Sequence, residues 1–303
     1  MYRSAAIVQQ GRWPCRAAKI GPMAASTQAL RRWADLRTTD FERLDPATTV
    51  AVLPVAAIEQ HGPHLPLSVD ADLIEGILVA AGPHVPPDCP AYLLPLQSVG
   101  LSPEHQCFAG TLTLRPETVL RLWGEIGESV ARAGVRKLLI FNSHGGHAGI
   151  MDLVARDLRT RLDLLVYSAS WFNLPLLDAQ GQDLNARFSA AEHRFGIHAG
   201  QVETSMMLAL KPELVRMELA RDFPSTSQQR SARYPILGNG RSAKLAWQMQ
   251  DYHPAGAVGN AAAADAETGR ELVAAAGRSL AQLLQELSAL PLSTLVDSPD
   301  FGR

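Results

Sequence analysis

A short segment of the sequence combines five side chains that can bind a metal ion or carry a proton. Residues 57–72 read AIEQHGPHLPLSVDAD and include Glu59, His61, His64, Asp70 and Asp72. Imidazole and carboxylate groups together suit zinc, manganese or iron, and two ions can share a carboxylate. Glu59 and His61 are two residues apart, so on an extended segment their side chains point the same way. The segment predicts a metal site to which Asp70 returns from a loop as a bridge.

Three other segments contain similar residue types. Residues 101–105 read LSPEH, residues 142–147 read NSHGGH and residues 198–205 read HAGQVETS. The first two follow predicted strands, and the third opens a predicted helix. Because parallel strands have their carboxyl ends at one edge of a sheet, we expect these segments to meet residues 57–72 there. A single histidine of this kind would be an ordinary structural residue, whereas four segments at one edge favour a shared site.

The elements that must position these residues alternate along the chain. Apolar runs predict buried strands, and apolar residues at helical spacing predict helices between and after them. The strands are Val50–Val55, Tyr92–Leu96, Lys137–Phe141 and Leu164–Ser168, and the helices lie within 116–134, 150–162 and 272–287. This alternation predicts an α/β fold with a mostly parallel central sheet covered on both faces.

Composition limits the kind of partner that the chain can have. The 303 residues are 47% hydrophobic with a formal net charge of −2, so a large core can form and no bulk charge attracts nucleic acid or an anionic membrane. A small molecule is the expected substrate. Three scattered cysteines without a CxxC pair indicate a reducing cytoplasm, and no apolar run approaches the ~18 residues of a membrane span.

We expect residues 30–290 to form one domain. Residues 1–25 are expected to be a disordered extension, because the first 34 residues contain five Arg, one Lys and no acid. That composition is typical of an amphipathic transit segment or of an extension upstream of Met23. Residues 218–262 are rich in Pro, Gly, Ser and Arg, and they predict a surface excursion that forms part of a lid or a subunit contact.

Two other chemistries compete with the metal site as interpretations of these segments. The glycine-bearing loop at 142–147 could cradle a phosphate at a helix N-terminus, but it lacks the GxGxxG spacing and the Walker lysine. A nucleophilic triad needs a GxSxG elbow or a cysteine beside a histidine partner, and neither is found. The metal site is therefore the stronger hypothesis.

The four segments resemble the creatininase (creatinine amidohydrolase) family. The resemblance rests on LPVAAIEQHGPHLPLSVD at 53–70, SPEH at 102–105, FAGT at 108–111, NSHGGH at 142–147 and HAGQVETS at 198–205, and it extends over about residues 30–290. It implies a three-layer α/β/α fold and homo-oligomers that are often hexamers. It also implies two divalent metal ions (Zn, Mn or Fe) acting on a compact or cyclic amide.

Position by position, the resemblance implies roles for single residues. The implied metal ligands are Glu59, His61, Asp70 and His144, with Asp70 as the bridge, and His198 matches a catalytic histidine.

The sequence also departs from creatininase proper, which has a glutamate ligand where this chain has Gly146. The last ligand is therefore expected from Glu203, which is also a catalytic candidate, with His147 as the second choice. Arg194 stands where creatininase proper has a tryptophan over its substrate, whereas Trp171 matches an aromatic of the substrate pocket. Arg194 therefore indicates an anionic group on the substrate and argues against creatinine.

The expected function is hydrolysis of a small amide or cyclic amide other than creatinine by a metal-activated water. His198 is the expected proton donor to the leaving nitrogen, and His105 is next in line. Three alternatives stay open within the resemblance. They are a peptidase of the kind that matures mycofactocin, a formamide deformylase, and a metal-binding scaffold or sensor without catalysis.

Overall fold

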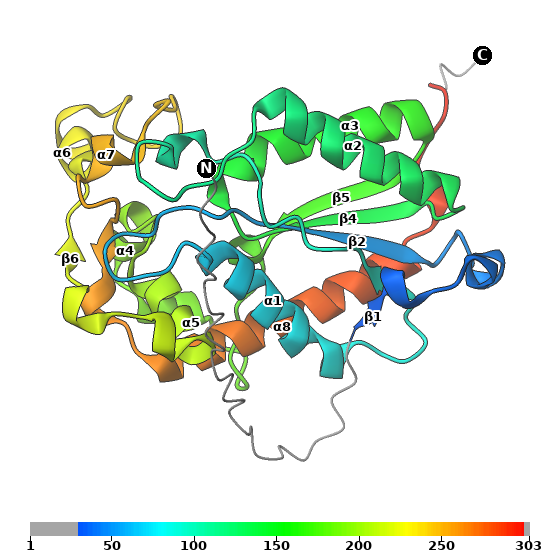
Figure 1. The fold of residues 1–303 in the computed structure, drawn as a ribbon, viewed down its shortest axis with the longest axis horizontal. Coiled ribbons are helices and arrows are strands. Elements are labelled where there is room, and N and C mark those ends of the chain that lie inside the picture. Colours follow the sequence, from blue (N-terminus) through cyan, green and yellow to red (C-terminus); the bar gives the residue numbers. More distant parts are fainter. Residues whose placement is uncertain (1–29, 300–303) are drawn as a thin grey trace, which may run out of the picture.

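A five-stranded parallel sheet forms the centre of the protein (Figure 1). The computed structural model describes residues 30–299, so the predicted N-terminal extension lies outside the described residues. The strand order is β1-β3-β2-β4-β5, with β1 (Arg31–Arg32), β2 (Val50–Val55), β3 (Ala91–Leu93), β4 (Lys137–Asn142) and β5 (Leu165–Ser170). The four predicted strands are confirmed, although the second of them (β3) ends at Leu93 and the fourth (β5) extends to Ser170.

Helices cover both faces of this sheet (Figure 1). One face carries α2 (Pro116–Arg132) and α3 (Ala148–Leu162), and the other carries α1 (Val69–Ala81), α5 (Gln201–Leu210) and α8 (Ala266–Ala289). Successive residues of β2 alternate between the two cores: Val50 and Val52 pack toward α1 and α8, whereas Ala51 and Leu53 pack toward α2 and α3. This confirms the predicted three-layer α/β/α fold.

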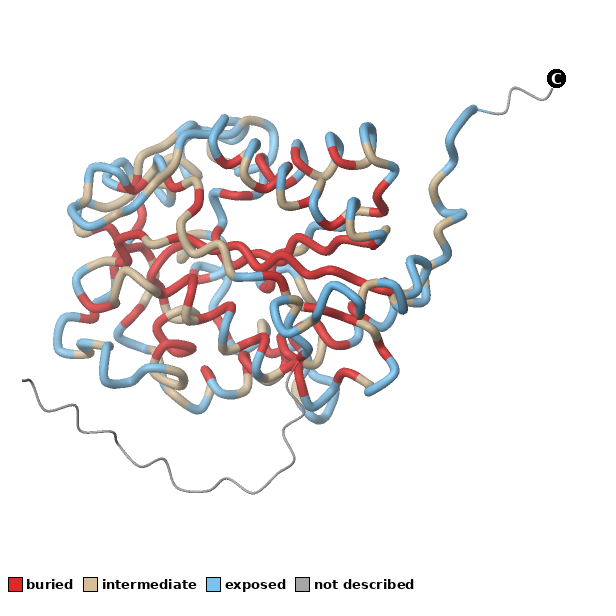
Figure 2. The backbone as a smooth tube through the Cα atoms, turned by 45° about the vertical axis from the view of Figure 1, so that its right-hand side comes forward, coloured by how far each residue is buried: buried red, intermediate tan, exposed pale blue. Residues whose placement is uncertain are grey.

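Burial follows from the layers. Figure 2 shows buried residues along the central strands and on the inward sides of the helices, with exposed outer turns. Each residue of β2 and β4 is buried, which explains their continuous apolar sequences. Between residues 30 and 299, no helix combines the length and the apolar character needed to cross a membrane.

The long helix α8 packs against α1 and α5, which carry the candidate site residues Asp70 and Glu203. Its Asp265 cap accepts the N–H of Thr268 at 2.8 Å and fixes the start of the helix. A side chain at Gly269 would overlap the backbone of α5 at Ser205, and one at Gly277 would overlap α1 at Ala80. The two glycines therefore let α8 approach α5 and α1 closely.

A buried lysine fastens the far end of α8 to the middle of the sheet. Lys137 opens β4 and is fully buried, and its Nζ donates to the carbonyls of Leu287 and Ser288 at 2.9 Å and 2.7 Å. These carbonyls belong to the last turn of the helix, where a cation complements the helix dipole. The link ties α8 to β4 at the edge of the sheet opposite the candidate site.

The predicted excursion at 218–262 contains short elements rather than an unstructured loop. It includes β6 (Asp222–Phe223), α6 (Thr226–Arg233), α7 (Met249–Tyr252) and β7 (Gly259–Asn260), and β6 pairs antiparallel with β7. Together with α4 (Ala190–Phe195), these elements lie beyond the carboxyl ends of the strands (Figure 1). They therefore wall the region in which the sequence predicts the site.

Candidate metal centre

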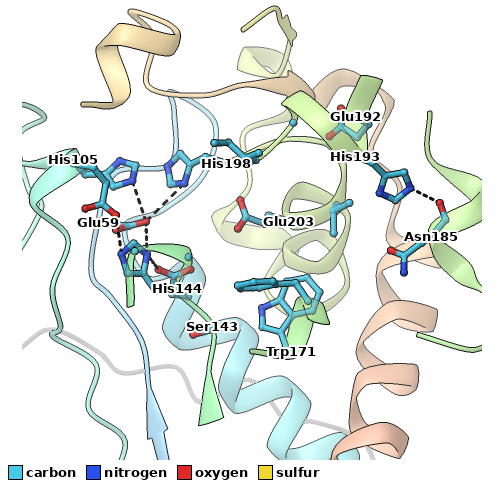
Figure 3. A pocket seen from close by; sticks show the side chains of 18 of the residues that line it. Glu59, His105, Ser143, His144, Trp171, Asn185, Glu192, His193, His198 and Glu203 are labelled. Carbon is cyan, nitrogen blue, oxygen red and sulfur yellow. Dashed lines mark hydrogen bonds and ion pairs between the residues drawn. The ribbon is translucent and has the colours of Figure 1, made fainter. Parts of the chain in front are cut away.

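A cavity of about 460 Å³ opens at the carboxyl ends of β2 and β4 (Figure 3). Residues from all four predicted segments line it, so the structure brings together side chains that are far apart in the sequence. Its polar lining is dominated by carboxylates and histidines. The five carboxylates are Glu59, Asp70, Glu104, Glu192 and Glu203. This concentration of negative charge favours a cation.

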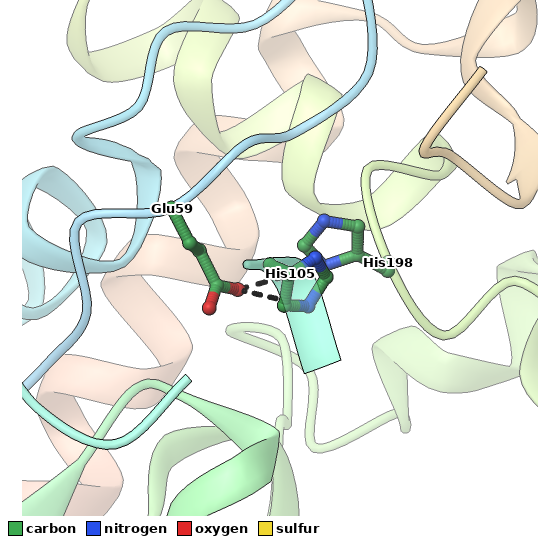
Figure 4. Close-up of side chains that lie close together, drawn as sticks. All are labelled: Glu59, His105 and His198. Atoms are coloured by element: carbon green, nitrogen blue, oxygen red, sulfur yellow. Dashed lines mark ion pairs between the residues drawn. The ribbon is translucent and has the colours of Figure 1, made fainter. Parts of the chain in front are cut away.

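Glu59 lies at the centre of the histidines. Its Oε1 is 3.2 Å from His144 Nδ1, 3.5 Å from His105 Nε2 and 3.8 Å from His198 Nδ1 (Figure 4 shows the last two). Its other oxygen, Oε2, accepts a hydrogen bond from the Ser102 hydroxyl. The carboxylate is 1% exposed. Ser102 therefore orients the carboxylate so that Oε1 faces the cavity.

Asp70, in the first turn of α1, presents its two oxygens to two different histidines. Oδ1 lies 3.8 Å from His61 Nε2, and Oδ2 lies 3.3 Å from His144 Nδ1. Burial, and secondarily the charge of Glu59, raise the pKa of Asp70 to about 6. A carboxylate placed between two imidazoles in this way has the geometry of a bridge between two ions.

His61 offers a buried lone pair that nothing else uses. Its Nδ1 lies 3.1 Å from the carbonyl of Glu59, so Nδ1 carries the proton and donates to that carbonyl. Burial, followed by the charge of His198, lowers the pKa of His61 well below its ordinary value, so the ring is neutral. Its Nε2 is buried and has no hydrogen-bond partner within residues 30–299. A neutral imidazole held by its other nitrogen is the usual state of a metal ligand.

His144 has its two nitrogens in two different surroundings. Nδ1 faces Glu59 and Asp70, whereas Nε2 lies 3.2 Å from Glu104 Oε1 and 3.2 Å from the carbonyl of Leu101. Burial acts to lower the pKa of His144, but Glu59 and the contacts with Asp70 and Glu104 outweigh it and raise the pKa well above its ordinary value. A cation at Nδ1 would take the place of the proton on that nitrogen, while the Nε2–H group continues to donate to the Glu104 carboxylate.

Glu104 occupies the space that a side chain at position 146 would fill. A Cβ added at Gly146 would overlap the Glu104 carboxylate and the His144 ring. Burial acts to raise the pKa of Glu104, but the contact with His144 outweighs it and the pKa lies below its ordinary value. Glu104 was not among the site residues predicted from the sequence, although it lies in the SPEH segment. The signal that could have found it is Gly146, because a missing side chain leaves room for another.

His198 and Glu203 lie on the other side of His61. His198 Nε2 is 2.7 Å from the carbonyl of Gln60 and donates to it, which leaves the lone pair on Nδ1 facing Glu59. Glu203 Oε2 accepts the N–H of Ala199 at 2.5 Å, and Ala199 itself has a left-handed backbone with φ 53°. Burial, followed by the charge of Asp70, raises the pKa of Glu203 to about 8.

The candidate ligand atoms form three groups whose members lie within 4.8 Å of one another. They are Glu59 with Asp70 and His144, His61 with His198 and Glu203, and Glu59 with His105 and His198. The first two groups flank Asp70, whose oxygens face His144 and His61. The donor set and the unpartnered Nε2 of His61 fit a pair of divalent ions.

The hydrogen bonds of His105 fix its tautomer. Gln60 Oε1 accepts the N–H of Gly62 at 2.9 Å, so the amide nitrogen of Gln60 must be the group that donates to His105 Nδ1 at 2.7 Å. Because Nδ1 accepts, the proton of the neutral ring is on Nε2, which faces Glu59. His105 therefore presents an N–H donor to the cavity.

His147 has no free nitrogen for a metal. Its Nε2 accepts the N–H of Leu101 at 3.0 Å, and its Nδ1 donates to Asn142 Oδ1 at 3.0 Å. His64 does not line the cavity, and its Nε2 is 3.0 Å from the Thr204 hydroxyl. Of the alternatives for the last ligand, only Glu203 lines the cavity.

The two predicted substrate residues have different positions. Trp171 lines the cavity and is 3% exposed. Arg194 lies outside it, because its guanidinium donates to the carbonyl of Gly238 at 3.2 Å and lines a neighbouring cavity. The structure thus does not place a side chain from position 194 over the candidate metal centre.

Known proteins resemble this chain in sequence and in fold. The family model described as creatinine amidohydrolase matches residues 34–284. A mycofactocin precursor peptide peptidase of Mycobacterium ulcerans is 30% identical over 79% of this chain and 86% of that protein. The creatinine amidohydrolase of Pseudomonas putida is 29% identical over 70% and 86%, and a solved mutant creatininase of the Zn-Zn type, 25% identical over 84% and 96%, superposes with a TM-score of 0.65. The chain therefore belongs to the creatininase family and is a hydrolase that acts on carbon–nitrogen bonds.

Proposed function

We propose that the chain hydrolyses an amide bond with two divalent metal ions bound on either side of Asp70. One ion would be held by Glu59, Asp70 and His144, and the other by His61, Asp70 and His198. The observation that carries this proposal is the division of the ligand atoms between the two oxygens of Asp70, together with the unpartnered Nε2 of His61. The Zn-Zn form of a related creatininase supports it.

When bound, such ions supply a water of lowered pKa and polarise the carbonyl oxygen of the amide. The protein must then move a proton from the attacking water to the leaving nitrogen. We assign this step to Glu203, whose carboxylate points into the cavity between His198 and Trp171 (Figure 3). His105 Nε2–H would stabilise the charge that develops on the carbonyl oxygen, because it is a fixed donor facing the centre.

This proposal changes the role expected for His198. The sequence predicts His198 as the proton donor, but its Nε2–H is used by the carbonyl of Gln60 and its free lone pair faces Glu59. An imidazole whose N–H on one nitrogen is held by a backbone carbonyl presents its other nitrogen as a ligand. We therefore place His198 with His61 in the second ligand set and keep Glu203 for proton transfer.

For the substrate we propose an open-chain amide, with short peptides first. Two observations support this choice over creatinine. The cavity of about 460 Å³ shares the lining residues Trp247 and Ile197 with a second cavity of about 480 Å³, so a ligand that reached both would be larger than a single small ring. The relative from M. ulcerans is named as a peptide peptidase.

Metal removal and reconstitution test the proposed chemistry. Purified protein is stripped with a chelator, reloaded with Zn²⁺, Mn²⁺ or Fe²⁺, and assayed on creatinine, formamides, lactams and short peptides, with metal content measured by mass spectrometry. We expect about two ions per chain, hydrolysis of a peptide and weak or absent creatinine turnover. Asp70→Asn should lose one ion and slow hydrolysis by about 10³-fold or more, because metal charge stabilisation contributes several kcal/mol. Hydrolysis by fully stripped protein would contradict the proposal.

Two further properties stay predictions. A homo-oligomer, hexameric by resemblance, can be tested by light scattering on the purified chain. A cytoplasmic location can be tested by cell fractionation.

A further inference from the structure

The second cavity differs in charge from the first. It has a volume of about 480 Å³ and is lined by Arg194, Arg230, Arg241 and Lys244, without any Asp or Glu. Within residues 30–299, none of these four side chains takes part in an ion pair. Four cations around one hollow without an acidic partner favour an anion as the ligand.

Arg230 is the least exposed of these cations. Its Nη1 donates to the Thr226 hydroxyl at 2.9 Å, and its guanidinium lies 4.9 Å from the centre of the Tyr252 ring. Its Nη2 is a buried atom without a hydrogen-bond partner among the described residues. A guanidinium held on one edge and stacked on a ring presents its other edge to a ligand at little further cost in entropy.

The loop that faces Arg230 is also ordered by local hydrogen bonds. Asn239 Oδ1 accepts the N–H groups of Arg241 and Ser242, both at 2.9 Å. Arg194 joins α4 to this loop through the carbonyl of Gly238. The cations therefore come from three separate segments that converge on one hollow.

Aromatic rings connect this hollow to the candidate metal centre. Trp247 and Ile197 line both cavities. The Trp247 ring packs edge-on against His105 with the ring centres 6.2 Å apart, and its centre lies 4.9 Å from that of Tyr252. One wall thus runs from His105 at the metal centre, through Trp247 and Tyr252, to Arg230.

We propose that the hollow lined by Arg194, Arg230, Arg241 and Lys244 binds an anionic group of the substrate, and that this group is a carboxylate. A substrate would then lie along the Trp247 wall with its amide at the acidic, metal-binding end and its carboxylate at the basic end. A carboxylate matches the paired N–H groups of a guanidinium edge. The inference rests on the proposed open-chain amide substrate and adds a charge requirement to it.

Binding of two matched peptides tests the inference without the need for turnover. N-acetyl-dialanine with a free carboxylate and the same peptide with a carboxamide end are titrated into the metal-free protein by calorimetry. Hydrogen bonds to charged groups should make the carboxylate form bind about 10- to 100-fold more tightly. Arg230→Gln should remove this preference. Arg233→Gln is the matched control, because Arg233 lies exposed on the same helix α6, stacks on Tyr234 and does not line the hollow.

The outcomes separate this inference from the proposed function. Equal affinity for the two peptides, binding of neither, or an unchanged preference in Arg230→Gln would overturn the anion site. Inorganic phosphate that displaces the carboxylate peptide but not the carboxamide peptide supports a shared anion pocket. Displacement only by phosphate, with no carboxylate preference, would overturn the carboxylate assignment. Failure of the metal-loaded protein to hydrolyse any amide, with the carboxylate preference intact, would reject the proposed hydrolysis alone.

Discussion

The two cavities that share Trp247 are built in opposite ways. In the metal-binding cavity, the ligand candidates follow strand ends or open helices, and they are nearly all buried and held by a second group such as Ser102, Glu104 or a backbone carbonyl. In the basic cavity, the cations come from short helices and a loop, and three of the four are exposed. Bond-breaking chemistry needs atoms fixed within fractions of an ångström, whereas attraction between charges acts over longer distances.

This difference predicts two kinds of mutational effect. Substitutions in the metal-binding cavity should change metal content, rate or folding by large factors. Substitutions in the basic cavity should change which substrate is preferred. The following variants test the first half of this comparison, since the Arg230 series above tests the second.

The largest effect should come from the proton-transfer group. Glu203→Gln should keep both ions and slow hydrolysis by about 10²- to 10⁴-fold, because general acid–base groups contribute that much. His198→Ala should instead lose an ion, because its Nδ1 faces the ligand set. Rates and metal content measured on the same samples check both. Retained metal with a slowed rate in His198→Ala would return the proton-donor role to His198.

A second large effect should appear in folding stability. Glu192 is buried, and its two carboxylate oxygens accept the N–H groups of Gln201, at the start of α5, and of Asn260, in β7. Glu192→Ala leaves both N–H groups without an acceptor and should lower the free energy of unfolding by roughly 2–4 kcal/mol. Urea denaturation of the metal-free protein measures it. Ser189→Ala, which removes the N-cap of α4, the helix that carries Glu192, should cost less, about 1 kcal/mol.

A smaller effect should come from the residue that orients His144. Glu104→Gln weakens the acceptor of the His144 Nε2–H and should lower metal affinity by about 10- to 100-fold. Glu117→Gln is the control, because that carboxylate is 70% exposed on the surface of α2. Competition with a metal indicator measures both. Equal affinity in the two variants would remove Glu104 from the centre.

A further effect should be a dependence on pH. Burial raises the pKa of Asp70 to about 6 and that of Glu203 to about 8, so the folded metal-free protein keeps protons that the unfolded chain loses near pH 4. Below about pH 6.5 the buried histidines with lowered pKa values, such as His61, oppose this effect, so the free energy of unfolding should fall with pH between about 7 and about 8, where Glu203 keeps its proton only in the folded protein. Since an ion at Nδ1 of His144 replaces the proton held there, the dissociation constant of the metal should fall roughly tenfold per pH unit between pH 6 and 8. An affinity independent of pH would contradict this protonation pattern.

The fold and the location of the site were predictable from the sequence. β2 and β4 are buried on both faces, which gives unbroken apolar runs, and polar segments start where these strands end. The parallel arrangement then requires residues 57–72 and 142–147 to meet. These inferences need only local patterns and one rule of topology.

The partners of the site residues were not predictable in the same way. Glu104 contacts His144 across 40 positions, and Glu192 accepts an N–H from Asn260 across 68 positions, so no local pattern indicates either pair. The tautomer of His198 depends on the carbonyl of Gln60, which the sequence does not place. Arg194 is four residues before His198 in the sequence, but its long side chain reaches the loop at Gly238 instead of the metal-binding cavity.

The closely packed helix α8 has a consequence for the order in which the protein can be made. Its glycines fit against α1, which carries Asp70, and against α5, which carries Glu203, and its last turn is tied to β4 by Lys137. A ribosome synthesises this helix after every candidate ligand has already left the exit tunnel. The nascent chain therefore carries its complete set of ligands while the apolar sides of α1 and α5 are still uncovered. Premature termination before residue 266 should give a chain that aggregates rather than a weak enzyme.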